Sequence, residues 1–176
     1  MTALWLAVVG GVLLAFSLAR TEPALASKGA QLKADIEATT FLAYRHALID
    51  YKLANPTVTG TINKNLLTLP WGLNANAIQG WSNTIQGGEL YVYADAGNDR
   101  AAVLAAAVRK SGYSINIGTK SGTGNLISHT MNSRLIDDPD DATKKIFDPT
   151  SVKIDTQIVL PAAIPAGAMT MVGVDG

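Results

Sequence analysis

The pattern begins with a predominantly apolar segment, Ala3 to Ala19, with no charged side chain in it. Its length is near the short end of the ~17–25 residues that cross a bilayer as a helix. A cleavable signal peptide is the alternative, because Ala24-Leu25-Ala26 has the form of a processing site. The length of the segment and the lack of basic residues before it favour an uncleaved helix over a signal, and a buried core helix is the third interpretation. We therefore expect residues 1–26 to form a membrane anchor.

A polar joint at Thr21-Glu22-Pro23 separates this segment from a pattern typical of an amphipathic helix. Proline removes a helical hydrogen bond, so the helix is expected to break or kink there. Beyond the joint, one face carries apolar residues at spacings of three and four, and this face widens along the helix. Its members are Leu32, Ile36, Ala43, Ala47 and Tyr51, joined in the second half by Phe41, Tyr44 and Leu48. The pattern predicts a stalk helix over residues 27–55, capped by Ser27, with an exposed first half and a packed second half.

The remainder of the chain alternates between short strand patterns and turns rich in glycine and proline. Strands are predicted at residues 57–62, 89–94, 113–118, 126–129, 151–160 and 168–174. A helix is predicted to begin after Asn98 or Asp99, either of which suits its N-cap, and to end at Gly112. Residues 66–81 are expected to form a loop that folds back on the core. The prediction for residues 56–176 is a small α+β domain with a mainly antiparallel sheet and a packed helix.

Charge and cysteine content narrow the classes of function. The chain has 14 basic and 14 acidic side chains, so it carries no net charge that would attract nucleic acid or an anionic surface. It has no cysteine, which excludes disulfides, zinc–thiolate sites and a thiol nucleophile. We expect no nucleic-acid partner.

Motifs that suggest catalysis or metal binding lack the spacing that the chemistry needs. Residues 118–124 are rich in glycine, but Lys120 precedes the second glycine and a strand follows, whereas a phosphate loop enters a helix. Ser128-His129 has no nucleophile elbow around it. The acidic segment 137–141 lacks the glycine and the distal glutamate of a calcium loop. A glycosidase-like pair of carboxylates stays open, with nothing in its favour. We predict a protein that is not an enzyme, with no metal and no cofactor.

Several short motifs are spread over most of the chain. They are Tyr44-Arg45-His46-Ala47, Ala54-Asn55-Pro56, Val58-Thr59-Gly60-Thr61, Leu67-x-Leu69-Pro70, Gly87-Gly88, Leu90-Tyr91-Val92-Tyr93, Leu160-Pro161 and Ile164-Pro165-x-Gly167. Together they resemble the PilM family of type IVB pilus biogenesis proteins. The resemblance implies a small envelope protein with one N-terminal apolar segment, acting in the assembly of pili such as thin conjugative pili. It carries over no catalytic residue.

The leading hypothesis is a component of pilus assembly that passes once through the bacterial inner membrane by Ala3 to Ala19, with its C-terminal domain in the periplasm. The periplasmic placement follows from the resemblance, because the basic residues after the apolar segment by themselves favour a cytoplasmic side. The expected partners are other pilus assembly proteins, and a homo-oligomer stays open. The predicted contact surface combines the 71–81 loop with an exposed sheet face, through Trp71, Trp81, Tyr91 and Tyr93. Alternatives are a minor pilin-like subunit of the fibre and a secreted enzyme that acts on the cell wall.

Overall fold

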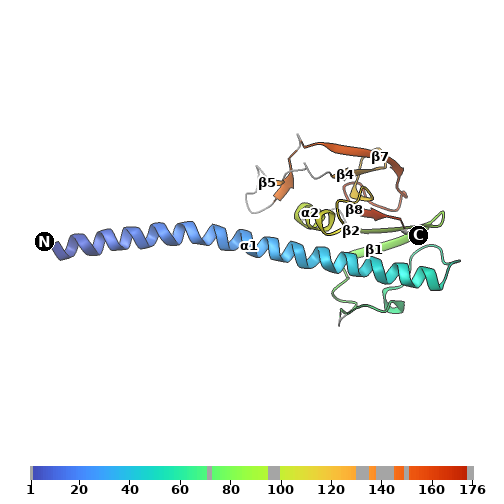
Figure 1. Cartoon of the computed structure of the whole chain (residues 1–176), viewed down its shortest axis with the longest axis horizontal. Coiled ribbons are helices and arrows are strands. Elements are labelled where there is room, and N and C mark those ends of the chain that lie inside the picture. The colour runs from blue at the N-terminus through green and yellow to red at the C-terminus, as the bar shows by residue number, and fades with distance from the viewer. Residues whose placement is uncertain are drawn as a thin grey trace. The chain divides into compact units, whose positions relative to one another are not determined.

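A computed structural model describes residues 2–70, 73–94, 100–129, 135–137, 145–148 and 151–173, with side chains from residue 28 onward. The chain divides into two compact units, Met1–Ala34 and Asp35–Gly176. The first unit is helical in its described part. The second contains the rest of the same helix and every strand that the structure describes (Figure 1).

Helix α1 runs from Thr2 to Ala54. The break expected at Pro23 and the helix start expected at Ser27 are therefore wrong. A proline inside a helix removes one hydrogen bond, at a cost of about 3 kcal/mol. The residues around Pro23 include several alanines and Leu25, which are strong helix formers, and they favour a helix that continues on both sides of the proline.

Membrane spanning was predicted for the first part of α1. Within the portion of the chain whose side chains are described, no helix combines the length and the apolar character needed to cross a bilayer. The predicted anchor, Ala3 to Ala19, belongs to the part of α1 whose side chains lie outside the described residues. It stays a prediction.

Six strands form one antiparallel sheet in the order β1-β2-β8-β3-β4-β7, which confirms the predicted antiparallel α+β class. The strands are β1 Trp81–Gln86, β2 Glu89–Ala94, β3 Ile117–Lys120, β4 Asn125–His129, β7 Lys153–Val159 and β8 Met169–Val172. The last strand, β8, lies between the hairpins β1–β2 and β3–β4, so the end of the chain joins them into one sheet. Figure 1 shows β1 and β7 at opposite margins. A separate two-stranded sheet pairs β5 Leu135–Asp137 with β6 Lys145–Phe147.

The predicted strands at 57–62 and 113–118 differ most from the structure. In the segment 57–62 only Gly60 pairs, through an isolated bridge to Ile85, because its φ of 75° turns the backbone away from an extended course. At 113–118 the strand begins only at Ile117, because Tyr113 has a φ of 63° and belongs to the end of the preceding helix. That helix is α2, Arg100–Lys110.

The predicted end of α2 at Gly112 is confirmed. The amide of Gly112 donates to the carbonyl of Arg109, and the amide of Tyr113 donates to that of Val108. These bonds satisfy carbonyls that the last helical turn leaves free, and Gly112 adopts the left-handed conformation that they require. The predicted caps, Asn98 and Asp99, lie outside the described residues.

The second half of α1 packs on the sheet, as its widening apolar face predicts. Phe41, Tyr44 and Leu48 are fully buried, and the ring centre of Phe41 lies 4.8 Å from that of Trp81 on β1. Ile36, earlier on the helix, is 66% exposed. The opposite face of the sheet is covered by the segment before β8, whose Leu160, Ile164 and Ala168 form one apolar cluster with residues of β2, β4 and β8. Both faces of the sheet are therefore covered.

A buried polar group joins α1 to the sheet. The side-chain amide of Asn83 on β1 donates to the hydroxyl of Tyr44 at 2.6 Å and to the carbonyl of Ile62 at 3.0 Å, while its oxygen accepts from the amide of Ile62 at 2.8 Å. Burial raises the pKa of Tyr44, and the hydrogen bond from Asn83 partly opposes that rise. The arrangement fixes the segment after α1 against the first strand.

Replacing Tyr44 with phenylalanine should lower the free energy of unfolding by about 1 kcal/mol, because it removes one buried hydrogen bond and leaves the ring in place. Urea unfolding of the full chain measures the effect. Tyr51→Phe is the matched control, since Tyr51 is a half-buried tyrosine on the same helix. Equal destabilisation by both substitutions would contradict a specific role for the Tyr44–Asn83 bond.

Candidate partner-binding surface

The aromatic residues predicted to contact a partner do not form one surface. Trp71 lies outside the described residues. Trp81 opens β1 instead of belonging to a loop, and it is only 3% exposed. The guanidinium carbon of Arg100 lies 4.7 Å from the centre of its ring, and Arg100 is held by Glu37 on α1 at 3.0 Å. Trp81 is thus a core residue at the junction of both helices with the sheet.

Tyr91 and Tyr93 share one face of β2, as predicted, but the expectation that this face is exposed is wrong at Tyr91. Tyr91 is 8% exposed because the segment that contains Leu160 and Ile164 covers it, and Tyr93 packs against the same cluster. Burial, followed by the charge of Glu89, raises the pKa of Tyr91. Trp81 pairs with Ala94 and therefore lies on the opposite face from both tyrosines. The role of these aromatic residues in partner binding stays a prediction.

The covering segment is held to the sheet by Lys120. Its Nζ donates to the carbonyls of Pro161 at 2.8 Å and Ile164 at 2.7 Å. The glycine-rich stretch around Lys120 forms the turn between β3 and β4, as predicted, where the amide of Asn125 donates to Ser121. The lysine of the phosphate-loop alternative is therefore already engaged by backbone carbonyls.

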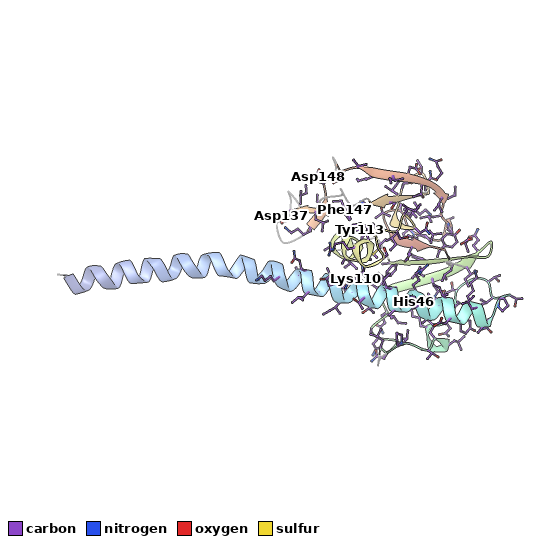
Figure 2. The ribbon with its side chains drawn as sticks, viewed as in Figure 1. His46, Lys110, Tyr113, Asp137, Phe147 and Asp148 are labelled. Atoms are coloured by element: carbon purple, nitrogen blue, oxygen red, sulfur yellow. The ribbon has the colours of Figure 1, made fainter. Side chains whose placement is uncertain are left out.

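Ser128 and His129 do not act as a pair, because neighbouring residues in a strand point to opposite faces. The hydroxyl of Ser128 donates to the carbonyl of Ile117 at 3.1 Å. His129 is 5% exposed and stacks on Phe147 of β6, with ring centres 3.8 Å apart (Figure 2 labels Phe147). Among the described residues neither ring nitrogen has a hydrogen-bond partner. Burial and, secondarily, the charge of Lys153 lower the pKa of His129 to about 4, so the ring is neutral near pH 7.

The acidic segment is described only at its beginning. Asp137 ends β5 and forms an ion pair with Lys145 on β6, whereas Asp138, Asp140 and Asp141 lie outside the described residues. Within the described part of the chain, no three His, Cys, Asp or Glu side chains are grouped so that they could hold a metal. His46, on α1, is exposed (Figure 2).

Three of the large apolar side chains that face solvent lie on or beside β7, at the margin of the sheet, and the others lie on α1, at Leu66 and at Tyr113 and Ile115. Val152 is 60% exposed, Ile154 42% and Val159 71%. On its inner side β7 pairs with β4, and its outer side has no paired strand among the described residues. The other margin, β1, is partly occupied by the Gly60–Ile85 bridge. The motifs gave no indication of this edge, because strand order depends on contacts between distant segments.

Only the first part of β7 is a regular edge. The register with β4 shifts between Asn125 and Ile127, and Gln157 adopts a φ of 60° in the bulge that results. The backbone amide of Gln157 donates to the carboxylate of Asp155 at 2.9 Å. The same carboxylate also accepts from the side-chain amide of Asn125. Exposed backbone suited to pairing is therefore confined to the residues around Ile154.

Comparison with known proteins covers most of the chain. A family model described as PilM matches residues 11–140. Among solved structures, a protein named PilM from Escherichia coli B7A is similar, with a TM-score of 0.48 and 20% identity over 81% of this chain and 92% of that chain. A likeness this distant does not transfer function. No curated protein matches the chain significantly. Because the family model covers well over half of the sequence, the chain belongs to the PilM family.

Proposed function

We propose that this protein acts in pilus biogenesis as a non-enzymatic, membrane-anchored component that binds other pilus assembly proteins. The observation that carries the proposal is the PilM family match over residues 11–140. The apolar segment Ala3 to Ala19 supports an anchor in the inner membrane, and the resemblance to proteins of type IVB, or thin conjugative, pili supports a domain in the periplasm. Exposed apolar residues around β7 offer a surface for protein partners.

Deletion of the gene tests the role in pili. We expect loss of pili, and of any transfer that depends on them, with recovery when the full chain is supplied from a plasmid. Pili of normal number and length in the deletion strain would overturn the proposal. Electron microscopy of cells counts the pili directly.

Membrane anchoring is tested separately by placing charges in the apolar segment. A charged side chain at the centre of a bilayer helix costs about 3 kcal/mol on insertion scales, so Val9→Asp with Leu13→Asp should release the chain from the membrane fraction. Leu53→Asp, at a residue that is 68% exposed on the same helix, is the control and should leave fractionation unchanged. If the doubly substituted chain stays in carbonate-washed membranes, the segment is not the anchor.

A second candidate is a minor pilin-like subunit that enters the fibre. The observation in its favour is that α1 continues from Thr2 to Ala54 and its second half packs on an antiparallel sheet, because a long N-terminal helix with an α+β head is a pilin layout. Immunodetection in sheared and purified pili separates the candidates. Protein within the fibre favours the subunit, and protein found only in the cell envelope favours the assembly component.

A further inference from the structure

The outer edge of β7 has a local sequence that is complementary to itself. Lys153 and Asp155 flank Ile154 and project from the same face of the strand, because side chains alternate. All three residues are exposed, and Lys153 takes part in none of the ion pairs found among the described residues. A basic and an acidic residue placed symmetrically about an apolar one are suited to antiparallel pairing about a two-fold axis.

We propose that β7 pairs antiparallel with β7 of a second copy of this chain, with the two-fold axis at Ile154. In this register Lys153 lies opposite the partner's Asp155, and Asp155 lies opposite the partner's Lys153. Ile154 meets the partner's Ile154 on the other face. The six-stranded sheet of each copy then continues across the contact.

Charge complementarity favours a second copy over an unrelated strand. An exposed lysine on an edge strand normally discourages pairing with another strand. The pairing would leave the positive charge of the lysine without an acidic side chain beside it. In the self-paired register each lysine gains an acidic neighbour, and directly opposite charges contribute roughly 0.2–1 kcal/mol per pair. The same strand therefore selects its own copy and resists others.

The bulge limits the extent of the contact. Beyond Thr156 the left-handed Gln157 and the shifted register interrupt the regular edge, so only about five residues of each strand pair. Directly opposite cross-strand positions have Cβ atoms roughly 4.5–5.5 Å apart. A contact of this size holds two copies weakly, and it closes after two because a two-fold contact uses the same edge of both copies.

Cysteine crosslinking tests the register directly, because the chain has no native cysteine. Ile154→Cys, introduced in the full chain and expressed in cells, should form disulfide-linked dimers on mild oxidation, seen on non-reducing gels. Thr156→Cys is the matched control on the same strand. Thr156 lies opposite the partner's Val152, so its crosslinked fraction should be at least fivefold lower. Equal crosslinking at both positions, or none at Ile154 in a folded chain, would overturn the register.

Charge exchange tests the reason for self-pairing. In the Ile154→Cys background, Lys153→Asp places like charges opposite each other and should reduce the crosslinked fraction about fivefold, as should Asp155→Lys. Co-expression of these two variants with different tags restores opposite charges in both pairs, so a mixed dimer should exceed either homodimer. Because Asp155 also bonds Asn125, Lys153→Asp alone suffices if Asp155→Lys fails to fold. Crosslinking that is insensitive to Lys153→Asp, or capture of a different protein at residue 154, would overturn the proposal.

Discussion

Replacement of Gly118 by alanine is expected to destabilise the sheet by about 3 kcal/mol, near the upper end of overpacking effects. Gly118 lies in β3, between Thr170 of β8 and Ser128 of β4. A Cβ atom added there would stand 2.0 Å from the carbonyl oxygen of Ile127 and 2.6 Å from its carbon. These are backbone atoms of a strand that is paired on both sides, so they cannot move aside as a flexible side chain would. Relief of the clash requires β3 and β4 to separate locally.

Urea unfolding of the full chain measures the change for Gly118→Ala. Gly122→Ala is the matched control in the turn that follows β3, because a Cβ there meets no atom within 4 Å. We expect the control to unfold at the same urea concentration as the parent chain, within error. If the two variants have equal midpoints, the close approach of β3 and β4 at Gly118 is not a feature of the folded protein.

Stability is expected to fall as the pH is lowered from about 6.5 to about 4, through His129. Its pKa is about 4 in the folded chain, below the ordinary value of 6.5, so the unfolded chain binds more protons in this interval. The stabilisation from the neutral ring is complete above 6.5 and is lost progressively down to 4. The difference corresponds to about 3 kcal/mol at most. The physical cause is burial of the imidazole against Phe147, with Lys153 adding a smaller repulsion.

His129→Leu should flatten the pH dependence of the unfolding midpoint between pH 4 and 6.5, because leucine fills the site without a titrating group. His46→Leu is the matched control, since His46 is exposed, and its curve should follow that of the parent chain. Thermal unfolding followed by circular dichroism over this pH range makes the comparison. A His129→Leu curve parallel to the parent curve would show that other groups dominate.

The local sequence pattern was sufficient to predict a helix or strand where neighbouring residues decide the backbone conformation. Alternation located β2, and the alanine-rich segment ending at Gly112 located α2, because these signals depend on side chains a few residues apart. The same approach failed at Tyr113, which was predicted to begin a strand but instead belongs to the C-terminal end of α2, with a positive φ. It failed at Pro23 as well, where strong helix formers on both sides outweigh one missing hydrogen bond.

The candidate surface was predicted less well than the fold. Trp81 and Tyr91 were singled out because aromatic residues are common in contact surfaces, but the same side chains are common in cores, and both are buried. The exposed edge of β7 was missed as a surface. The alternating pattern of β7 predicts a strand, but the local sequence does not indicate that one side of this strand lacks a paired strand.

The sequence by itself determined the α+β class, the packing of the second half of α1 and the β3–β4 hairpin, because periodicity and turn residues act over short distances. Its short motifs also carried the likeness to the PilM family. The β1–β2 hairpin was not predicted, because β1 begins in a segment that was expected to be a loop. Only the tertiary structure decided which strands are neighbours. It placed β8 between two hairpins, covered the tyrosine face with the segment before β8, buried His129 under β6 and left β7 at the margin. Each of these depends on contacts between residues far apart in the chain, which hydrophobic burial selects and local pattern does not specify.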